Sequence, residues 1–524
     1  MSQFLSTETI VIELLLVVTV VALAVRRFNI PYTVALVVMG LLLALRAPAK
    51  ISLTPELILA LFVPPLAFEA AFHINFQDLR RNLAGILVLA VPGVILTMLI
   101  VGGLLAVGTG LSLAATLVFG ALIAATDPIS VVAIFRTLGV PKRLSVLIEG
   151  ESLFNDGTAI VLYNLALAVV LTGKFNLLTS LGDFLSVSIG GVLVGLLLGW
   201  IISFLISRVD DYLIETTLTT LLAFGSYLLA ERLHFSGVLA VVAAGLICGN
   251  LGPRGMSPTT RIVLFNFWEY VAFLANSLIF LLLGLQVNIP ALLASWPFVL
   301  WAILAVLAAR AVVVYGLGWI VNKFADPIPK RWLHVLNWGG LRGAIALALV
   351  LSLPPNFANR DQFRLMAFGV VLFTLLVQST TMRPLIQWLG IITRNPSRLE
   401  YEKRHARLTS MRAALNHLDK LHKDGLLSTH AWEILRPEYE KQVLACTAEV
   451  RQTLKAAPDL EAEELDTARR EALRAQRSAL LGLFRDGIIS QEVLSELGME
   501  IDLELSKEGF LPAVDAKEER AKER

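Results

Sequence analysis

Residues 112–136 read SLAATLVFGALIAATDPISVVAIFR, and this stretch decides the fold. It has the length and the apolar character of a helix that crosses a lipid bilayer, which needs about 20 mainly apolar residues. Thr126, Asp127 and Pro128 interrupt it. Because proline lacks a backbone donor and disfavours helical backbone at the preceding residue, the helix should unwind there. The sequence therefore predicts a membrane helix that is broken at an acidic residue.

Further windows of similar length and apolar character lie on both sides of this stretch. They predict an all-α polytopic membrane protein with about 13 transmembrane helices. The first window lacks the basic segment of a signal peptide, so we expect it to be retained. The predicted spans are 8–25, 30–46, 56–74, 84–107, 112–136, 146–171, 181–206, 213–231, 236–250, 262–286, 296–321, 331–353 and 363–389.

The charged residues are distributed unevenly along the chain. Of the 524 residues 56% are hydrophobic and the mean hydropathy is +0.72, which excludes a water-soluble enzyme. Charged side chains account for 39 of residues 1–392 but for 47 of residues 393–524. We therefore predict a transmembrane domain over 1–392 and a water-soluble helical tail over 393–524. Neither part has the strong positive charge that a nucleic-acid partner would require.

Lysine and arginine in the connections predict the orientation. Connections from odd to even spans carry 13 such residues, and connections from even to odd spans carry 6. Because positive charge collects on the cytoplasmic side, we expect the N-terminus outside and the tail in the cytoplasm, in the cell (inner) membrane.

Ionisable residues inside the spans are costly, so they usually face a wet cavity or a partner. At 1.5 Å of rise per helical residue, three of them, Asp127, Asp156 and Arg342, lie about 15 Å from the cytoplasmic side, near mid-membrane. Glu13 and Glu269 stand alone and are interpreted as packing or interface contacts. The clustered residues are Glu69, Asp127, Glu149, Glu151, Asp156, Arg310 and Arg342.

Spacing separates the acidic residues of the sixth span. Ser152 and Asp156 are four residues apart, so a hydroxyl and a carboxyl share one helix face and form a candidate pair of cation ligands. Glu151 lies about 140° around the helix from Asp156. We therefore predict that Arg342 neutralises Glu151 while Asp156 stays free to exchange protons. The alternative is that Arg342 pairs with Asp156 itself, which would hold its charge and lock the site.

The twelfth span carries a second predicted break, where Gly339, Gly340 and Gly343 flank Arg342. The fifth and twelfth spans are seven apart and therefore run in opposite directions. This arrangement predicts an inverted repeat in which spans one to six correspond to spans eight to thirteen. The alternative is that each break is only a packing kink.

Five segments in series resemble the monovalent cation/proton antiporters of the NhaP/NHE (sodium/proton exchanger) type, over residues 8–390. A single segment would be weak support, but five in the expected order are specific. They are FVPPLAFEAAFHINFQDLRRN, ATDPISVVAIFRTLGVPKRL, EGESLFNDGTAIVLY, ANSLIFLLLGLQV and NWGGLRGAIALALVLSLP.

The resemblance implies a homodimer whose protomers each have a dimerisation domain and a mobile six-helix core, with the fifth and twelfth helices crossing at unwound segments. It implies that Asp156 is the essential cation- and proton-binding carboxyl. An asparagine before that residue, Asn155 here, implies electroneutral exchange. The other implied assignments are Thr126 and Asp127 at the crossing, Ser152 and Glu69 as further ligands, Na+ held at Asp156, Ser152, Glu69 and Thr126, and Glu151 with Arg342 as a structural ion pair.

The predicted activity is exchange of Na+ or Li+ for H+, with both competing for Asp156, and no cofactor is expected. A K+/H+ antiporter of the same family is the main alternative, followed by a cation channel. A membrane-embedded metal hydrolase is disfavoured because the spans offer only His73, His234 and His334, each near a span edge.

The tail has leucines at helical spacing, with breaks predicted near Gly425, Pro437, Pro458 and Gly487. We interpret it as a solvated helical bundle. A regulatory role is the alternative, although the tail has no nucleotide, calcium or zinc motif.

Overall fold

The computed structural model describes residues 2–28, 31–46, 58–209, 211–252, 256, 258–391 and 396–506. Within these ranges every regular element is a helix, so the all-α prediction is confirmed. Each predicted span falls on a helix or on two or three helical elements in series. The chain divides into two compact units, Met1–Thr393 and Arg394–Arg524.

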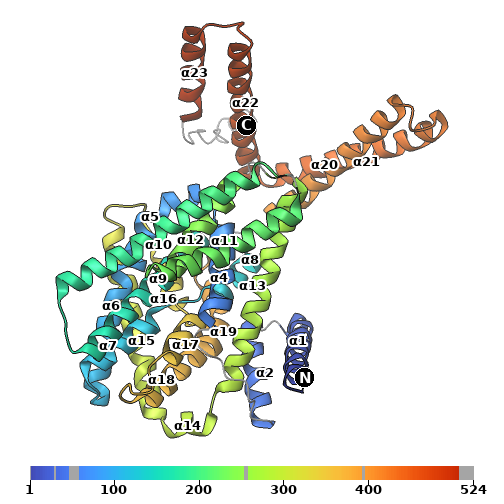
Figure 1. Ribbon diagram of the computed structural model, residues 1–524. Helices are drawn as coiled ribbons and strands as arrows, with labels where there is room; N and C mark the ends of the chain where they lie inside the picture. Colours follow the sequence, from blue (N-terminus) through green and yellow to red (C-terminus); the bar gives the residue numbers. More distant parts are fainter. Residues whose placement is uncertain are drawn as a thin grey trace, which may run out of the picture. The chain divides into compact units, whose positions relative to one another are not determined.

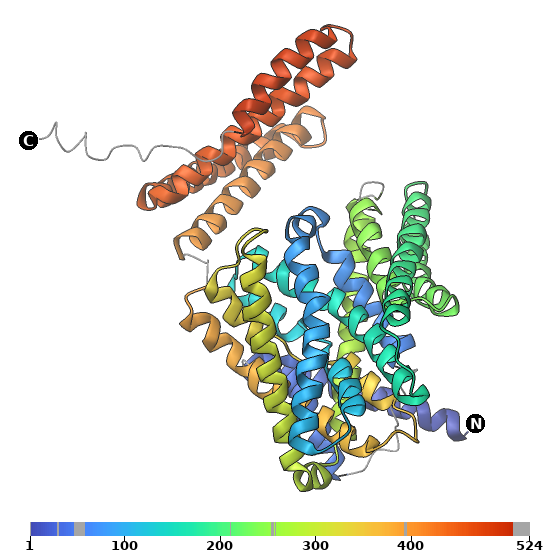
Figure 2. The same cartoon turned by 90° about the vertical axis from the view of Figure 1, so that its left-hand side faces the viewer.

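The helices of the first unit form a bundle (Figure 1), in which α6 packs lengthwise against α15 (Figure 2). Two short segments, η1 and η3, are π-helical. The elements are α1 (Ser2–Phe28), α2 (Tyr32–Arg46), η1 (Ile58–Phe62), α4 (Val63–His73), α5 (Phe76–Ala90), α6 (Pro92–Thr109), α7 (Leu113–Ala124), α8 (Ile129–Leu138), α9 (Lys142–Thr172), α10 (Leu177–Ile206), α11 (Tyr212–Arg232), α12 (Gly237–Leu251), α13 (Pro258–Gln286), α14 (Ile289–Ala294), α15 (Trp296–Val321), α16 (Lys330–Trp338), α17 (Ala344–Leu351), α18 (Arg360–Phe373), η3 (Thr374–Gln378) and α19 (Ser379–Trp388).

Length and composition support a multi-pass membrane protein. In the described residues, eight helices are long and apolar enough to cross a membrane, and four shorter apolar helices accompany them. The helix that contains the fourth predicted span already begins at Phe76, before the predicted start of the span at 84. Asn75 accepts hydrogen bonds from the first backbone N–H groups of α5, which stabilises a polar first turn that a search for apolar windows overlooks.

Both predicted breaks are present, and they contact each other. Residues 125–128 separate α7 from α8, and residues 339–343 separate α16 from α17. The backbone N–H of Asp127 donates to the carbonyl of Leu341 at 2.8 Å. A Cβ atom at Gly343 would lie 2.4 Å from the Cβ of Asp127, so only glycine permits this approach. The close contact joins two segments more than 200 residues apart.

The second unit contains α20 (Pro396–Lys423), α21 (Thr429–Ala456), α22 (Pro458–Arg485) and α23 (Gln491–Ser506). Helices α20 and α21 pack together around Leu408, Cys446 and Val450. The expected breaks near Gly425 and Gly487 are confirmed, since both residues have positive φ and follow helix ends. The expected break at Pro437 is wrong: this proline lies inside α21. Beside this proline, Arg436 and Trp432 of α21 contact Asp419 of α20.

Candidate ion-binding site

A cavity of about 470 Å³ lies beside the two breaks. Residues of α2, α4, α8, α9, α13 and α17 line it, together with the segment 125–128. Most of the predicted site residues are therefore brought together from distant parts of the chain. The cavity-lining carboxyl groups belong to Glu69, Asp127, Glu149, Asp156 and Glu269, and Thr126 and Ser152 line the same cavity.

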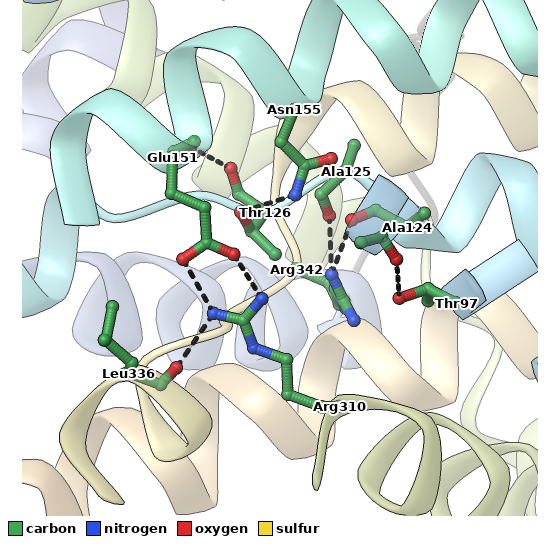
Figure 3. A network of polar contacts seen from close by, with 11 residues as sticks. Thr97, Ala124, Ala125, Thr126, Glu151, Asn155, Arg310, Leu336 and Arg342 are labelled. Atoms are coloured by element: carbon green, nitrogen blue, oxygen red, sulfur yellow. Dashed lines mark hydrogen bonds and ion pairs between the residues drawn. The ribbon is translucent and has the colours of Figure 1, made fainter. Parts of the chain in front are cut away.

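Thr126 connects the first break to helix α9 (Figure 3). The hydroxyl of Ser152 donates to the carbonyl of Thr126, and the side-chain amide of Asn155 donates to the Thr126 hydroxyl at 3.1 Å. Asn155 is buried and is not among the cavity-lining residues. Its place is behind the cavity wall, where it holds Thr126, whereas Ser152 and Thr126 reach the cavity itself.

Two hydrogen bonds orient Asp127, one made by its side chain and one by its backbone N–H. Its Oδ1 accepts from the backbone N–H of Ile129 at 3.0 Å, at the start of α8. A carboxylate in this position is favoured by the partial positive charge at a helix N-terminus. The bond from Ile129 and the backbone bond to Leu341 together fix the position of this carboxyl in the cavity wall.

Asp156 faces the same cavity from α9. Among the described residues, no arginine, lysine or histidine lies within 4.0 Å of its carboxyl oxygens as an ion pair. The alternative in which Arg342 locks Asp156 is therefore not the arrangement in this structure. Carboxyl groups and the hydroxyl-bearing residues Ser152 and Thr126 line the same cavity, and oxygen atoms of these kinds are the ligands that hard cations prefer.

The predicted ion pair between Glu151 and Arg342 is wrong. Glu151 instead forms a two-pronged pair with Arg310 of α15: Nη1 contacts Oε1, and Nη2 donates to Oε2 at 3.0 Å (Figure 3). Both side chains are buried, at 2% and 7% exposure. A Cβ atom at Gly340 would lie 2.7 Å from Nε of Arg310, so this glycine makes room for the guanidinium.

Arg342 binds backbone carbonyl groups in place of Glu151. Its Nη1 donates to the carbonyls of Ala124 and Ala125, at 2.8 and 3.2 Å, where α7 ends at the first break. These carbonyls have no partner within the helix and form its negative end, which a cation stabilises. Arg310 does the same for α16, because its Nη2 donates to the carbonyl of Leu336 at 2.8 Å. Each broken helix thus has one arginine at the end of its first half.

The remaining acidic residues occupy the cavity or its surroundings. Glu69 lies 3.4 Å from Nδ1 of His73, one helical turn further along α4. Glu269 was expected to make only packing or interface contacts, and this is wrong, since it lines the cavity. Glu13 lies outside the cavity and is exposed on α1.

Two arginines at the cavity or the site, Arg136 and Arg310, were not assigned a role from the sequence. Arg136 lines the cavity, although it was counted only as a charge in a connection. Arg310 was noted as a charge inside an apolar span but was given no partner. The sequence did contain a signal for its role. A single arginine in an otherwise apolar helix is costly when unpaired, and it therefore requires an acidic partner on a neighbouring helix. Among the described residues there is no cluster of three or more His, Cys, Asp or Glu that could hold a metal ion.

Membrane-length apolar helices, together with two broken helices beside a cavity into which five carboxyl groups reach, define a multi-pass membrane protein with acidic residues at a cavity of its helical bundle. The chain belongs to the sodium/hydrogen exchanger family, because the family model described as "Sodium/hydrogen exchanger, transmembrane" matches residues 14–388. This match includes both broken helices and all of the cavity-lining carboxyl groups.

Several characterised relatives align over most of this chain. The Na(+)/H(+) antiporter ApNhaP of Aphanothece halophytica is 40% identical over 477 residues, which are 90% of this chain and 91% of that protein. The low-affinity Na(+)/H(+) antiporter NhaS1 of Synechocystis is 42% identical over 399 residues, 75% of this chain and 76% of that protein.

The fold also has a solved counterpart. The sodium proton antiporter MjNhaP1 from Methanocaldococcus jannaschii superposes with a TM-score of 0.62 at 22% sequence identity. The superposition covers 74% of this chain and 100% of that structure. The two proteins therefore share a fold.

Proposed function

We propose that this chain is a secondary active antiporter that exchanges Na+ or Li+ for H+, and that it is not an enzyme. Relatives named as Na(+)/H(+) antiporters align over nearly its whole length. The observation that carries the proposal is the carboxyl of Asp156, which forms no ion pair among the described residues and shares a cavity with Asp127 beside two broken helices. The two buried arginines nearby bind other groups.

Asp156 is the shared ligand in this proposal. Na+ or Li+ binds to the carboxyl of Asp156 together with oxygens of Ser152, Thr126 and Glu69, all of which line the cavity. The Ser152 hydroxyl donates its proton to the Thr126 carbonyl, which leaves the lone pairs of its oxygen available to a cation. Proton and cation compete, because one carboxyl cannot hold both.

Competition for Asp156 leads to exchange if the protein changes between its inward and outward states only when the site holds a proton or a cation. A bare carboxylate is costly to carry through an apolar seal, so the protein alternates between inward and outward states with either a proton or a cation bound. Asn155 adds no second charge, which favours one-for-one, electroneutral exchange. One unit of pH difference supplies about 1.4 kcal/mol and balances an approximately tenfold opposing cation gradient.

The cavity residues also support an orientation. Arg136 lies near the end of α8, His73 ends α4, and Glu149 lies near the start of α9. These are the helix ends that the distribution of basic residues assigns to the cytoplasm. We propose that the structure is inward-facing, that the protein lies in the cell (inner) membrane with its N-terminus outside, and that two copies form a homodimer.

The decisive experiment is a pH-sensitive dye trapped in proteoliposomes that contain the purified protein. Addition of NaCl or LiCl should move protons and restore dye fluorescence, and an imposed voltage should not change the rate. A response to KCl alone would favour the K+/H+ alternative. Cation movement that proceeds without a pH gradient and rises linearly with voltage would favour a channel. No response to any of the three salts would overturn the proposal.

The tail is proposed to modulate exchange and not to catalyse it. A protein truncated after residue 392 should retain cation-driven proton movement. Its pH profile, measured in the same proteoliposomes, tests the regulatory idea: an unchanged profile assigns the tail a structural role only.

A further inference from the structure

The helix that ends the first unit contains a π-helical turn, η3, between α18 and α19. π-Helical turns are rare, and they occur frequently at functional sites because they displace side chains from the regular helical register. Thr374 begins this turn and is only 1% exposed. No motif of the sequence pointed to it.

The hydroxyl of Thr374 connects this turn to the second break. It donates to the carbonyl of Val371 in its own helix at 3.0 Å and accepts from the backbone N–H of Arg342 at 3.2 Å. By contrast, the hydroxyl of Thr380, in the same long helix, donates only to carbonyls of its own helix. Thr374 is therefore attached to the main chain of the unwound segment.

From Arg342 the contacts lead directly to the first break. The carbonyl of the preceding residue, Leu341, accepts a hydrogen bond from the backbone N–H of Asp127, and Gly343 closely approaches the Asp127 side chain. Asp127 in turn stands in the cavity wall beside Thr126. A shift of the segment 339–343 would therefore displace the carboxyl of Asp127 and the carbonyl groups of the first break.

We propose that Thr374 is a positioning residue that fixes the geometry of the cation ligands and thereby sets cation affinity and the preference between Na+ and Li+. The inference rests on the proposed function. Its physical basis is that oxygen ligands discriminate alkali cations through cavity size and ligand placement. Without the hydroxyl, the buried N–H of Arg342 has no acceptor, and the break relaxes to find one.

The test compares Thr374→Val, which keeps the shape but removes the acceptor, with Thr374→Ser, which keeps the hydroxyl. In proteoliposomes, Thr374→Val should raise the KM for Na+ by about tenfold, the scale of one lost buried hydrogen bond, and should change the ratio of the KM values for Na+ and Li+. Thr374→Ser should stay within about twofold of the parent, since it preserves the bond. Thr380→Val is the matched control and should behave like the parent.

The outcomes separate this inference from the proposed function. If the parent itself shows no cation-driven proton movement, the proposed function fails. If the parent exchanges and Thr374→Val has the same KM values and the same Na+/Li+ ratio, the positioning role is overturned. If Thr374→Val does not fold, Thr374→Ala repeats the test with less crowding. Failure of both to fold, with normal exchange by Thr374→Ser, would assign the hydroxyl to folding and also overturn the role.

Discussion

Two acidic residues on one helix, Glu151 and Asp156, have opposite surroundings. Glu151 forms an ion pair with the guanidinium of Arg310, whereas Asp156 faces the cavity and forms no ion pair among the described residues. They are five positions apart on α9 and therefore point in different directions around the helix. The rotation of one helix thus gives one carboxyl a fixed partner and leaves the other available to bind.

The comparison shows how the buried charges of this bundle are stabilised. Arg310 and Arg342 are both buried, and both donate to carbonyls at the end of a broken helix. Only Arg310 is also paired with an acid. The negative helix ends and Glu151 therefore account for the two buried cations, and Asp156 is not needed to neutralise either of them.

The largest expected effect is at the free acid. Asp156→Asn should reduce cation-driven proton movement by more than about 100-fold, because an amide can neither release a proton nor supply the charge that holds a cation. Dye fluorescence in proteoliposomes measures this. Asp183→Asn, an exposed acid of α10 outside the cavity, is the control and should exchange normally. Normal exchange by Asp156→Asn would remove the difference between the two acids.

The second effect concerns the paired acid. Arg310→Met leaves Glu151 buried without its partner and should cost about 3–5 kcal/mol of stability. The apparent melting temperature in detergent should fall accordingly. The double variant Arg310→Met with Glu151→Leu should recover most of the loss, since it removes both charges. If the second substitution adds to the damage instead, the pair is not the source of stability.

The third effect tests whether Arg342 acts on helix ends. Arg342→Met should cost about 1–3 kcal/mol, because buried carbonyls of Ala124 and Ala125 lose their donor. Adding Glu151→Gln should not restore stability, in contrast to the Arg310 case. A strong compensation between residues 342 and 151 in a double-mutant cycle would instead revive the ion pair that the sequence suggested.

The smallest effect is expected at the cavity wall. Glu269→Gln should raise the KM for Na+ about twofold to fivefold without changing the maximal rate, because this acid adds to the negative potential of the cavity. Glu13→Gln is the matched control, since Glu13 lies on α1 away from the cavity, and it should have no effect. Equal effects of the two substitutions would argue for a general surface-charge contribution.

Much of the fold could be predicted because its signals are local. Apolar runs of membrane length, the Pro128 break and the glycines around Arg342 each follow from the chemistry of neighbouring residues. The breaks were therefore placed correctly, and five of the residues assigned to the site from the sequence line the cavity, namely Glu69, Thr126, Asp127, Ser152 and Asp156. The inverted repeat remains a prediction drawn from the order of the spans.

The predictions that failed concerned contacts between residues on different helices. Glu151 was assigned Arg342 because Glu151 and Asp156 point in different directions around their helix, yet the residue that pairs with Glu151 is Arg310. Spacing along one helix says which side chains share a face, but it does not say which face of α15 meets α9. The role of Thr374 was missed for the same reason, since its acceptor function exists only where η3 touches the break.

The sequence by itself determined that this chain is a helical membrane protein with two interrupted spans and acidic residues inside apolar segments, because hydropathy and helix breaking act over a few neighbouring residues. Only the tertiary structure decided which acid pairs with an arginine and which forms no ion pair among the described residues. That choice depends on the rotation and packing of α9, α15 and the two breaks, where shifts of a few ångströms determine whether a buried charge has a partner.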